Sequence, residues 1–182
     1  MKTRSFDIEG PILFEPKKHV DARGVFMETF RRDLFLKSTG FDADFVQDNR
    51  SVSVNAGTLR GLHAQKPPRA QGKLVSVSAG SLYDVAVDIR KGSKTFGKSI
   101  ALRLSYETGA QFWVPPGFLH GFITLEPGTI VTYKCTDYYS ADDDITVAWN
   151  DPDLAIDWNH DAPSLSAKDA SAQSFANFSS PF

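Results

Sequence analysis

This chain has a single cysteine, no long apolar run and little net charge, and each shortage excludes a class of protein. With only Cys135, the chain cannot build an internal disulfide framework. No apolar segment approaches the roughly 20 residues that a transmembrane helix needs. A formal net charge of -2 argues against a nucleic-acid binder that relies on a basic surface. We therefore expect neither membrane nor nucleic acid among its partners.

The expected cellular location rests on the lack of a secretory signal and on the single cysteine. Residues 1–12 lack the apolar core of a secretory signal, and the single cysteine suits a reducing compartment, so we expect a cytoplasmic protein. Cys135 ends an alternating apolar and polar segment at residues 130–135. This setting favours a small buried side chain over a nucleophile.

The length of 182 residues suits one domain, residues 1–182, with a full hydrophobic core. Short β-prone runs alternate with Gly, Pro and Asp, which is typical of an all-β sandwich or barrel. The pattern predicts short helices at residues 33–39 and 166–170, and a loosely packed tail at residues 171–182. The predicted strands are residues 25–30, 45–53, 74–79, 81–88, 98–104, 111–114, 121–125, 130–136 and 145–149.

The densest group of polar residues lies at residues 47–49 and 57–65. In strict strand alternation Gly61 and His63 share one face and Arg60 lies on the other. A bulge at Gly61 would turn both Arg60 and His63 to the same side. An exposed basic strand end explains the same residues, and the spacing alone leaves both readings open.

Four other polar or aromatic residues stand out at strand positions. Lys73 opens an apolar strand, which by itself is more typical of a solvated strand end. His120 follows a rigid Pro-Pro-Gly turn and is either a rim residue or a residue that faces a ligand. Tyr133 is typical of a core residue with its hydroxyl at the edge. Glu28 shares a strand face with an aromatic residue, which fits a partly polar cavity better than a core.

Together, the order and spacing of these segments resemble the dTDP-4-dehydrorhamnose 3,5-epimerase family over residues 14–170. The motifs that carry the resemblance are Asp-Ala-Arg-Gly (21–24), Gln-Asp-Asn (47–49), Leu-Arg-Gly-Leu-His (59–63), Ala-Gln-Gly-Lys-Leu-Val (70–75), Asp-Val-Ala-Val-Asp-Ile-Arg (84–90), Pro-Gly-Phe-Leu-His-Gly-Phe (116–122), Trp-Asn-Asp-Pro (149–152) and Leu-Ser-Ala-Lys-Asp (165–169). The resemblance implies a cupin-type jelly-roll β-barrel with short peripheral helices. It also implies a homodimer that exchanges N-terminal segments and a dTDP-4-keto-6-deoxy sugar nucleotide as substrate.

The resemblance also implies a role for individual residues. His63 matches the catalytic base, held by Asp169, and Tyr133 matches the acid on the opposite face of the sugar. Lys73 matches the residue that stabilises the enolate oxygen, and Tyr139 the residue that stacks on thymine. The positions that match contacts to the nucleotide, the diphosphate or the sugar are Arg23, Glu28, Gln47, Asn49, Arg60, His120 and Lys168.

These residue types suit the implied reaction, epimerisation at C3 and C5 of dTDP-4-dehydro-6-deoxyglucose to dTDP-4-dehydro-L-rhamnose in dTDP-rhamnose biosynthesis. The 4-keto group acidifies the neighbouring C–H bonds by spreading charge onto its oxygen. Histidine accepts protons near neutral pH, and a carboxylate behind the ring fixes its tautomer. A preorganised lysine can stabilise the enolate oxygen, and arginines suit a diphosphate.

We expect neither a metal nor a cofactor. Many cupin proteins bind a metal through two close histidines on one strand, a carboxylate and a further histidine after a Pro-x-Gly turn. Here Gln65 stands where the second strand histidine would fall, which leaves His63 and His120 as nitrogen donors. Three protein ligands are usual at catalytic zinc and non-haem iron sites. The ketone itself serves as the electron sink.

Departures from the family pattern include Ala64, Asp144, Ile145 and residues 159–161, and two alternative functions remain. Ala64 stands where an aromatic residue is common after the base, and Asp144 stands where a glutamate is often found near the nucleotide. The first alternative is a single-centre 3- or 5-epimerase of a dTDP-4-keto-deoxysugar, which shares the same His, Asp and Tyr. The second is a non-catalytic sugar-nucleotide-binding cupin, which is disfavoured by the joint presence of four residues, His63, Lys73, Tyr133 and Asp169.

Overall fold

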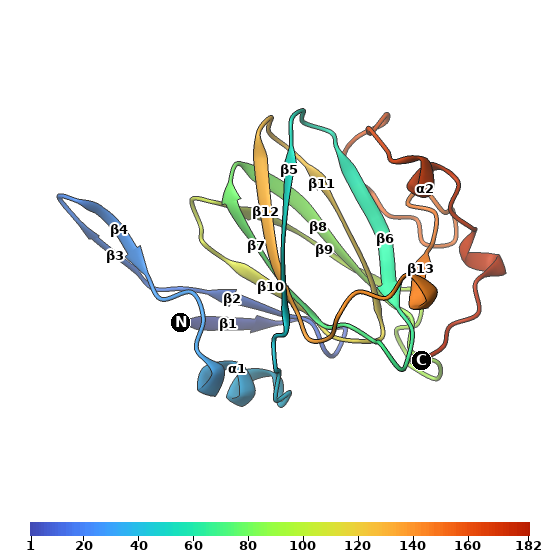
Figure 1. Cartoon of the computed structure of the whole chain (residues 1–182), viewed down its shortest axis with the longest axis horizontal. Helices are drawn as coiled ribbons and strands as arrows, with labels where there is room; N and C mark the ends of the chain where they lie inside the picture. Colours follow the sequence, from blue (N-terminus) through green and yellow to red (C-terminus); the bar gives the residue numbers. More distant parts are fainter.

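The computed structural model describes residues 1–182 and shows two antiparallel sheets that face each other (Figure 1). The six-stranded sheet has the order β1 (Lys2–Ser5), β2 (Ile12–Glu15), β10 (Gln111–Val114), β7 (Lys73–Ala79), β12 (Thr129–Cys135) and β5 (Gln47–Ser53). The five-stranded sheet has the order β13 (Asp144–Thr146), β6 (Leu59–Gln65), β11 (Phe118–Thr124), β8 (Ser81–Asp88) and β9 (Ser99–Ser105). The predicted all-β barrel is confirmed.

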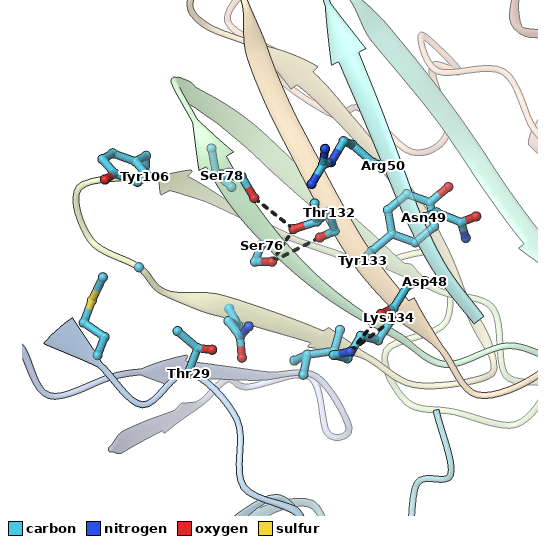
Figure 2. Close-up of a pocket in the computed structure, with 15 residues that line it drawn as sticks. Thr29, Asp48, Asn49, Arg50, Ser76, Ser78, Tyr106, Thr132, Tyr133 and Lys134 are labelled. Carbon is cyan, nitrogen blue, oxygen red and sulfur yellow. Dashed lines mark hydrogen bonds and ion pairs between the residues drawn. The ribbon is translucent and has the colours of Figure 1, made fainter. Parts of the chain in front are cut away.

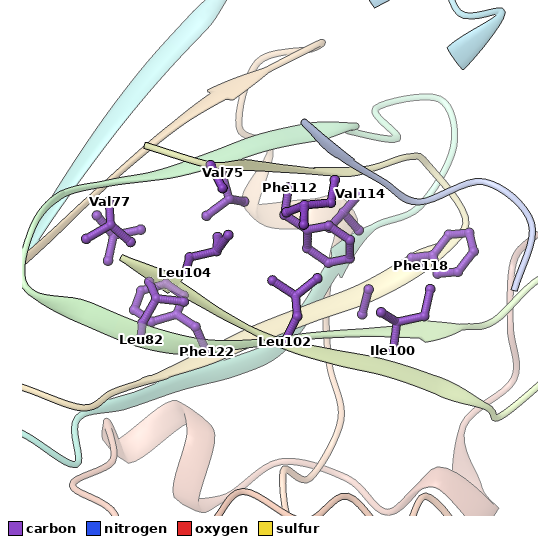
Figure 3. Close-up of a cluster of buried hydrophobic side chains, with 14 of the residues drawn as sticks. Val75, Val77, Leu82, Ile100, Leu102, Leu104, Phe112, Val114, Phe118 and Phe122 are labelled. Atoms are coloured by element: carbon purple, nitrogen blue, oxygen red, sulfur yellow. The ribbon is translucent and has the colours of Figure 1, made fainter. Parts of the chain in front are cut away.

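Alternation along the strands fills the space between the two sheets with apolar side chains. Val75 and Val77 on β7 face Leu82 and Phe122 of the other sheet, and these side chains form one buried cluster (Figure 3). Because inward side chains recur at every second residue, the same alternation decides which polar residues enter the barrel.

A second buried cluster covers the outer face of the five-stranded sheet. Leu62, Val85 and Leu119 point out of the barrel and pack against the C-terminal segment, including Trp158 and Phe178. The prediction of a loosely packed tail at residues 171–182 is therefore wrong. Its phenylalanines are anchors that the surrounding Ser, Ala and Asn residues obscured.

Hydrogen bonds also tie this tail to the barrel. The amide of Lys91 donates to the carbonyl of Phe182 at 2.8 Å, and the amide of Ala148 donates to the carbonyl of Gln173 at 2.8 Å. The tail is therefore fixed near both of its ends, and α2, which precedes it, contacts β6.

Two short helices lie at the periphery, as the sequence predicts. Helix α1 (Arg32–Thr39) ends at Gly40, which adopts a left-handed conformation and donates its amide to the carbonyl of Leu36. Helix α2 (Ala167–Ala170) begins after Ser166, whose side chain accepts the amide of Asp169. Single 3-10 turns occupy Ala141–Asp143 and Phe175–Asn177. No helix has the length and apolar character needed to cross a bilayer.

The remaining strands form an N-terminal hairpin that projects from the barrel (Figure 1). Strands β3 (Lys18–Asp21) and β4 (Gly24–Met27) pair only with each other. The predicted strand at residues 25–30 stops at Met27, because Met27 pairs with Lys18 at the end of the ladder. Strand β11 begins at Phe118 and not at residue 121, because Phe118 already pairs with Asp88.

Candidate active site

A bulge in β6 points two basic side chains into the barrel. His63 lies opposite His120 on β11, and Arg60 lies opposite Phe122, so β6 carries one extra residue between these pairs. Gly61 has φ +140°, and a Cβ there would lie 2.6 Å from the Cα of Gly121. Only glycine fits this close approach. The predicted bulge is confirmed.

His63 forms a close pair with a carboxylate from outside its own sheet. Its Nε2 lies 2.5 Å from Oδ1 of Asp169 on α2, and Ser166 donates its hydroxyl to Oδ2 at 2.8 Å. Burial opposes ionisation of Asp169, but the hydrogen bonds from His63 and Ser166 outweigh it and lower the pKa of this carboxyl. An ionised Asp169 accepts the Nε2 proton, which leaves Nδ1 of His63 as the ring nitrogen that can accept another proton.

The facing sheet contributes Lys73 and Tyr133. Tyr133 pairs with Val75, and Cys135 pairs with Lys73, so all four share the inner face of β7 and β12. Burial raises the pKa of Tyr133, although the charge of Arg60 opposes this, so the phenol keeps its proton well into the alkaline range. Burial lowers the pKa of Lys73.

Strand β5 adds amide side chains beside Cys135. Gln47 donates its side-chain amide to Oδ1 of Asn49 at 3.2 Å, and Asn49 donates to the sulfur of Cys135 at 3.5 Å. The backbone amide of Tyr139 donates to Oε1 of Gln47 at 2.9 Å, while the Tyr139 ring stays exposed. This hydrogen bond holds the backbone at Tyr139, and with it the exposed ring, beside the amide side chains of β5.

Lys168 stands beside Asp169 on α2 and pairs with Asp144 on β13. The neighbouring Gln65, which replaces a metal-binding histidine in the cupin pattern, is engaged in holding a loop. Its side chain donates to the carbonyl of Tyr138 at 3.1 Å and accepts the amide of Ser140 at 2.9 Å. The side chains form no cluster of three or more His, Cys, Asp or Glu that could hold a metal ion.

Two residues expected at the site lie apart from it within one chain. Arg23 lies at the tip of the projecting hairpin, 90% exposed, and pairs with Asp21 at 2.6 Å. Glu28 follows β4 and is also exposed. Both can join a site only if the hairpin reaches another copy of the chain, and their roles stay predictions.

The structure also adds a residue that the sequence reasoning missed. Asp84 on β8 is fully buried and lies 2.7 Å from Nε2 of His120 through its Oδ1. It shares the inner face of β8 with Leu82 and Ala86. A carboxylate on the apolar face of a strand is the signal that identifies it, because such a group enters the core only with a partner.

With this geometry in view, the relatives of the chain are informative. A family model described as dTDP-4-dehydrorhamnose 3,5-epimerase matches residues 5–177. The chain belongs to this family. The dTDP-4-dehydrorhamnose 3,5-epimerase of Sinorhizobium fredii is 49% identical over 158 residues, which cover 87% of this chain and 80% of that protein. The Pseudomonas aeruginosa enzyme of the same name is 46% identical over 178 residues, which cover 97% of both.

A solved member of the epimerase family shares the fold. The Legionella pneumophila dTDP-6-deoxy-D-glucose-3,5-epimerase, in complex with dTDP-4-keto-L-rhamnose, superimposes with a TM-score of 0.92 at 44% identity and covers 98% of this chain and 94% of that one. The expected cupin-type jelly roll and the isomerase class are therefore confirmed.

Proposed function

We propose that this epimerase-family chain inverts C3 and C5 of dTDP-4-dehydro-6-deoxyglucose to give dTDP-4-dehydro-L-rhamnose. The observation that carries the proposal is the buried Asp169 carboxylate behind His63, on the inner face of a barrel whose opposite wall carries Tyr133. Inversion requires proton removal from one face and return to the other, and two opposed sheets supply those two faces.

The steps use groups of the chain alone. Nδ1 of His63 takes the C–H proton, and the electron pair of that bond moves into an enolate on the C4 oxygen. Lys73 stabilises this oxygen from the facing sheet; removing one such donor typically costs about 2.7–4 kcal/mol of transition-state stabilisation. Tyr133 returns a proton to the opposite face, and exchange with solvent restores both residues. The ketone takes up the charge, so no cofactor is needed.

The substrate is held by the residues around these catalytic groups. We assign Arg60 and Lys168 to the diphosphate, since guanidinium and ammonium groups suit phosphate oxygens. The amides of Gln47 and Asn49 and the ring of His120 suit sugar and base oxygens. The exposed ring of Tyr139 offers a stacking surface for thymine. A sugar nucleotide of this kind is a cytoplasmic metabolite, so we place the enzyme in the cytoplasm.

We further propose that the chain acts as a homodimer. The projecting hairpin exposes 73% of Val20 and 70% of Phe26, which a lone chain would leave in water. A cavity of about 570 Å³ lies beside the base of the hairpin, with Met27 and Thr29 in its lining (Figure 2). A hairpin from a second copy would bury these apolar side chains and bring Arg23 and Glu28 to the partner site.

The dimer is tested by sedimentation of wild type and Phe26→Asp. We expect a dimeric wild type and a variant that dissociates while it keeps its circular dichroism spectrum. A wild type that sediments as a monomer at micromolar concentration would overturn the dimer but leave the chemistry of the barrel untouched.

The reaction is tested by turnover of dTDP-4-dehydro-6-deoxyglucose in D₂O, with the product examined by mass spectrometry and proton NMR. We expect two deuterium atoms, one at C3 and one at C5, with both centres inverted. One deuterium atom identifies a single-centre epimerase. Tight binding without any exchange identifies a non-catalytic sugar-nucleotide-binding protein, and either result overturns the proposal.

A further inference from the structure

Asp84 carries a buried oxygen with no partner. Its Oδ1 lies 2.7 Å from Nε2 of His120, and both side chains are almost completely buried. Its Oδ2 makes no hydrogen bond. A buried, unsatisfied polar atom lowers the stability of the fold by about 1–3 kcal/mol, and by more when the group is charged. Such an atom in a native structure therefore calls for an explanation.

The facing sheet holds a cation that lacks a carboxylate partner. Lys134 and Lys168 have carboxylate partners, Asp48 and Asp144, but Lys73 has none within ion-pair distance. Burial lowers the pKa of Lys73, while the negative charge of Asp84 acts against that shift. Asp84 therefore keeps one carboxylate oxygen without a partner, and its charge acts on Lys73, which lies on the inner face of the opposite sheet.

We propose that Asp84 is a positioning residue of the epimerase site: it orients the imidazole of His120 through Oδ1 and, through Oδ2, provides the counter-charge that keeps Lys73 an ammonium directed at the ketone oxygen. The inference deepens the proposed function and rests on it. A carboxylate fits this task because it can accept hydrogen bonds at both oxygens.

The strand register supports the arrangement. His120 is the Cα partner of His63, so the two rings lie side by side on the inner face of β6 and β11. Asp84 is the Cα partner of Phe122, two residues along β11 from His120. A fixed His120 ring therefore also restricts the space beside the ring of His63.

Other charged groups act on Lys73, and the test must separate them from Asp84. Cys135 on β12 and Asp144 on β13 favour its protonated form, and Lys168 on α2 opposes it. The remaining titratable groups on the inner faces of β6, β11 and β12 are Arg60, His63, His120 and Tyr133. Two carboxylates favour the ammonium form of Lys73. Asp144 already pairs with Lys168, whereas Asp84 is fully buried and has one oxygen without a partner.

The experiment compares Asp84→Asn, Asp84→Glu and a matched exposed control, Asp142→Asn. Titration of the side-chain nitrogens in [¹⁵N]lysine-labelled protein follows Lys73 directly, with its signal assigned from Lys73→Arg. We expect Asp84→Asn to move the Lys73 midpoint and the alkaline limb of the kcat profile to lower pH and to lower kcat by about 100-fold, the effect of a displacement near 1 Å. Asp84→Glu restores the charge and returns the midpoint toward wild type.

A purely structural role for Asp84 gives a different result. The isosteric Asn would then leave the Lys73 midpoint where Asp142→Asn leaves it, and the longer Glu would be the more damaging change; this pattern overturns the inference. If wild type fails to turn over the keto sugar, the proposed function fails, whereas the lysine titration still decides the electrostatic role of Asp84.

Discussion

Asp169 decides which nitrogen of His63 is free to take a proton. Its carboxylate is held in place by Ser166, which donates to Oδ2 and accepts the Asp169 amide. The pair joins positions 106 residues apart in the sequence. A four-residue helix is thereby enough to aim a carboxylate at a ring on the barrel wall.

Replacing Asp169 by Asn tests this orientation. The amide has the size of the carboxylate but can also present a donor to the ring, which favours the wrong tautomer of His63. In the Ser-His-Asp enzymes the same change lowers kcat about 10⁴-fold, and we expect a loss of about 10³- to 10⁴-fold here. Steady-state kinetics measure it, with the thermal midpoint as the folding control. A loss below about tenfold in a folded variant would argue against the assigned pairing.

Another buried carboxylate, Asp88, stabilises the fold and not the site. Asp88 at the end of β8 accepts two hydrogen bonds from the guanidinium of Arg90, at 2.9 and 2.8 Å, and one from each hydroxyl of Ser93 and Thr95, both at 2.6 Å. Burial opposes ionisation, but these hydrogen bonds outweigh it and hold the pKa of Asp88 well below its usual range.

The pH dependence of stability follows from that lowered pKa. Asp88 contributes its full stabilisation above the pKa of an unfolded Asp, near 3.9, and loses it only as the pH falls through the lower folded value. We expect Asp88→Asn to lower the free energy of unfolding by about 1.5–3 kcal/mol at pH 6, and by less at pH 3. Urea denaturation at both pH values measures this, and a deficit that grows toward pH 3 would contradict it.

Single residues also mark how far the sequence could predict the site. The inward turn of Arg60 and His63 was one of two readings that the sequence around Gly61 left open, and the register of β6 decides between them. The pairing of His63 with Asp169 rested on family resemblance, because no spacing rule joins residues so far apart. Asp84 was missed because it lies inside an apolar strand motif, where its partner His120 comes from another strand.

At the scale of elements, the bulge in β6 depends on one glycine. We expect Gly61→Ala to cost about 1–3 kcal/mol through its unfavourable φ, with an added steric clash against Gly121. Because the bulge aims Arg60 and His63, kcat should fall further than stability alone explains. The control is Gly128→Ala, where φ is +70° but no atom lies within 4 Å of the added Cβ. Equal effects of the two changes on kcat would refute the role given to the bulge.

Strand β1 was missed by the sequence pattern for a physical reason. Strand β1 consists of exposed Lys2, Thr3, Arg4 and Ser5, so it shows no apolar alternation and pairs only along its backbone with β2. Helix α1 was predicted correctly because Gly40 stops it and Phe35 anchors it. Apolar pattern and caps are local signals, whereas an edge strand depends on its partner.

At the scale of the molecule, two apolar layers position one group of polar side chains. The inner cluster holds the two sheets face to face, and the outer cluster binds the C-terminal segment to the back of the five-stranded sheet. That segment carries Asp169 to His63, while the facing sheet carries Tyr133. The barrel thus places the proposed base and the proposed acid on opposite walls, and the proposed reaction depends on this placement.

The most direct test of this claim is deuterium exchange in D₂O with wild type, His63→Ala and Tyr133→Phe. Mass spectrometry counts the labels, and proton NMR reports the configuration of C3 and C5. We predict labelled, inverted product from wild type, neither label nor inversion from His63→Ala, and label without inversion from Tyr133→Phe, because the base can still return a proton to its own face. Wild-type exchange in folded His63→Ala, or inversion at the wild-type rate in Tyr133→Phe, would contradict the two-walled mechanism.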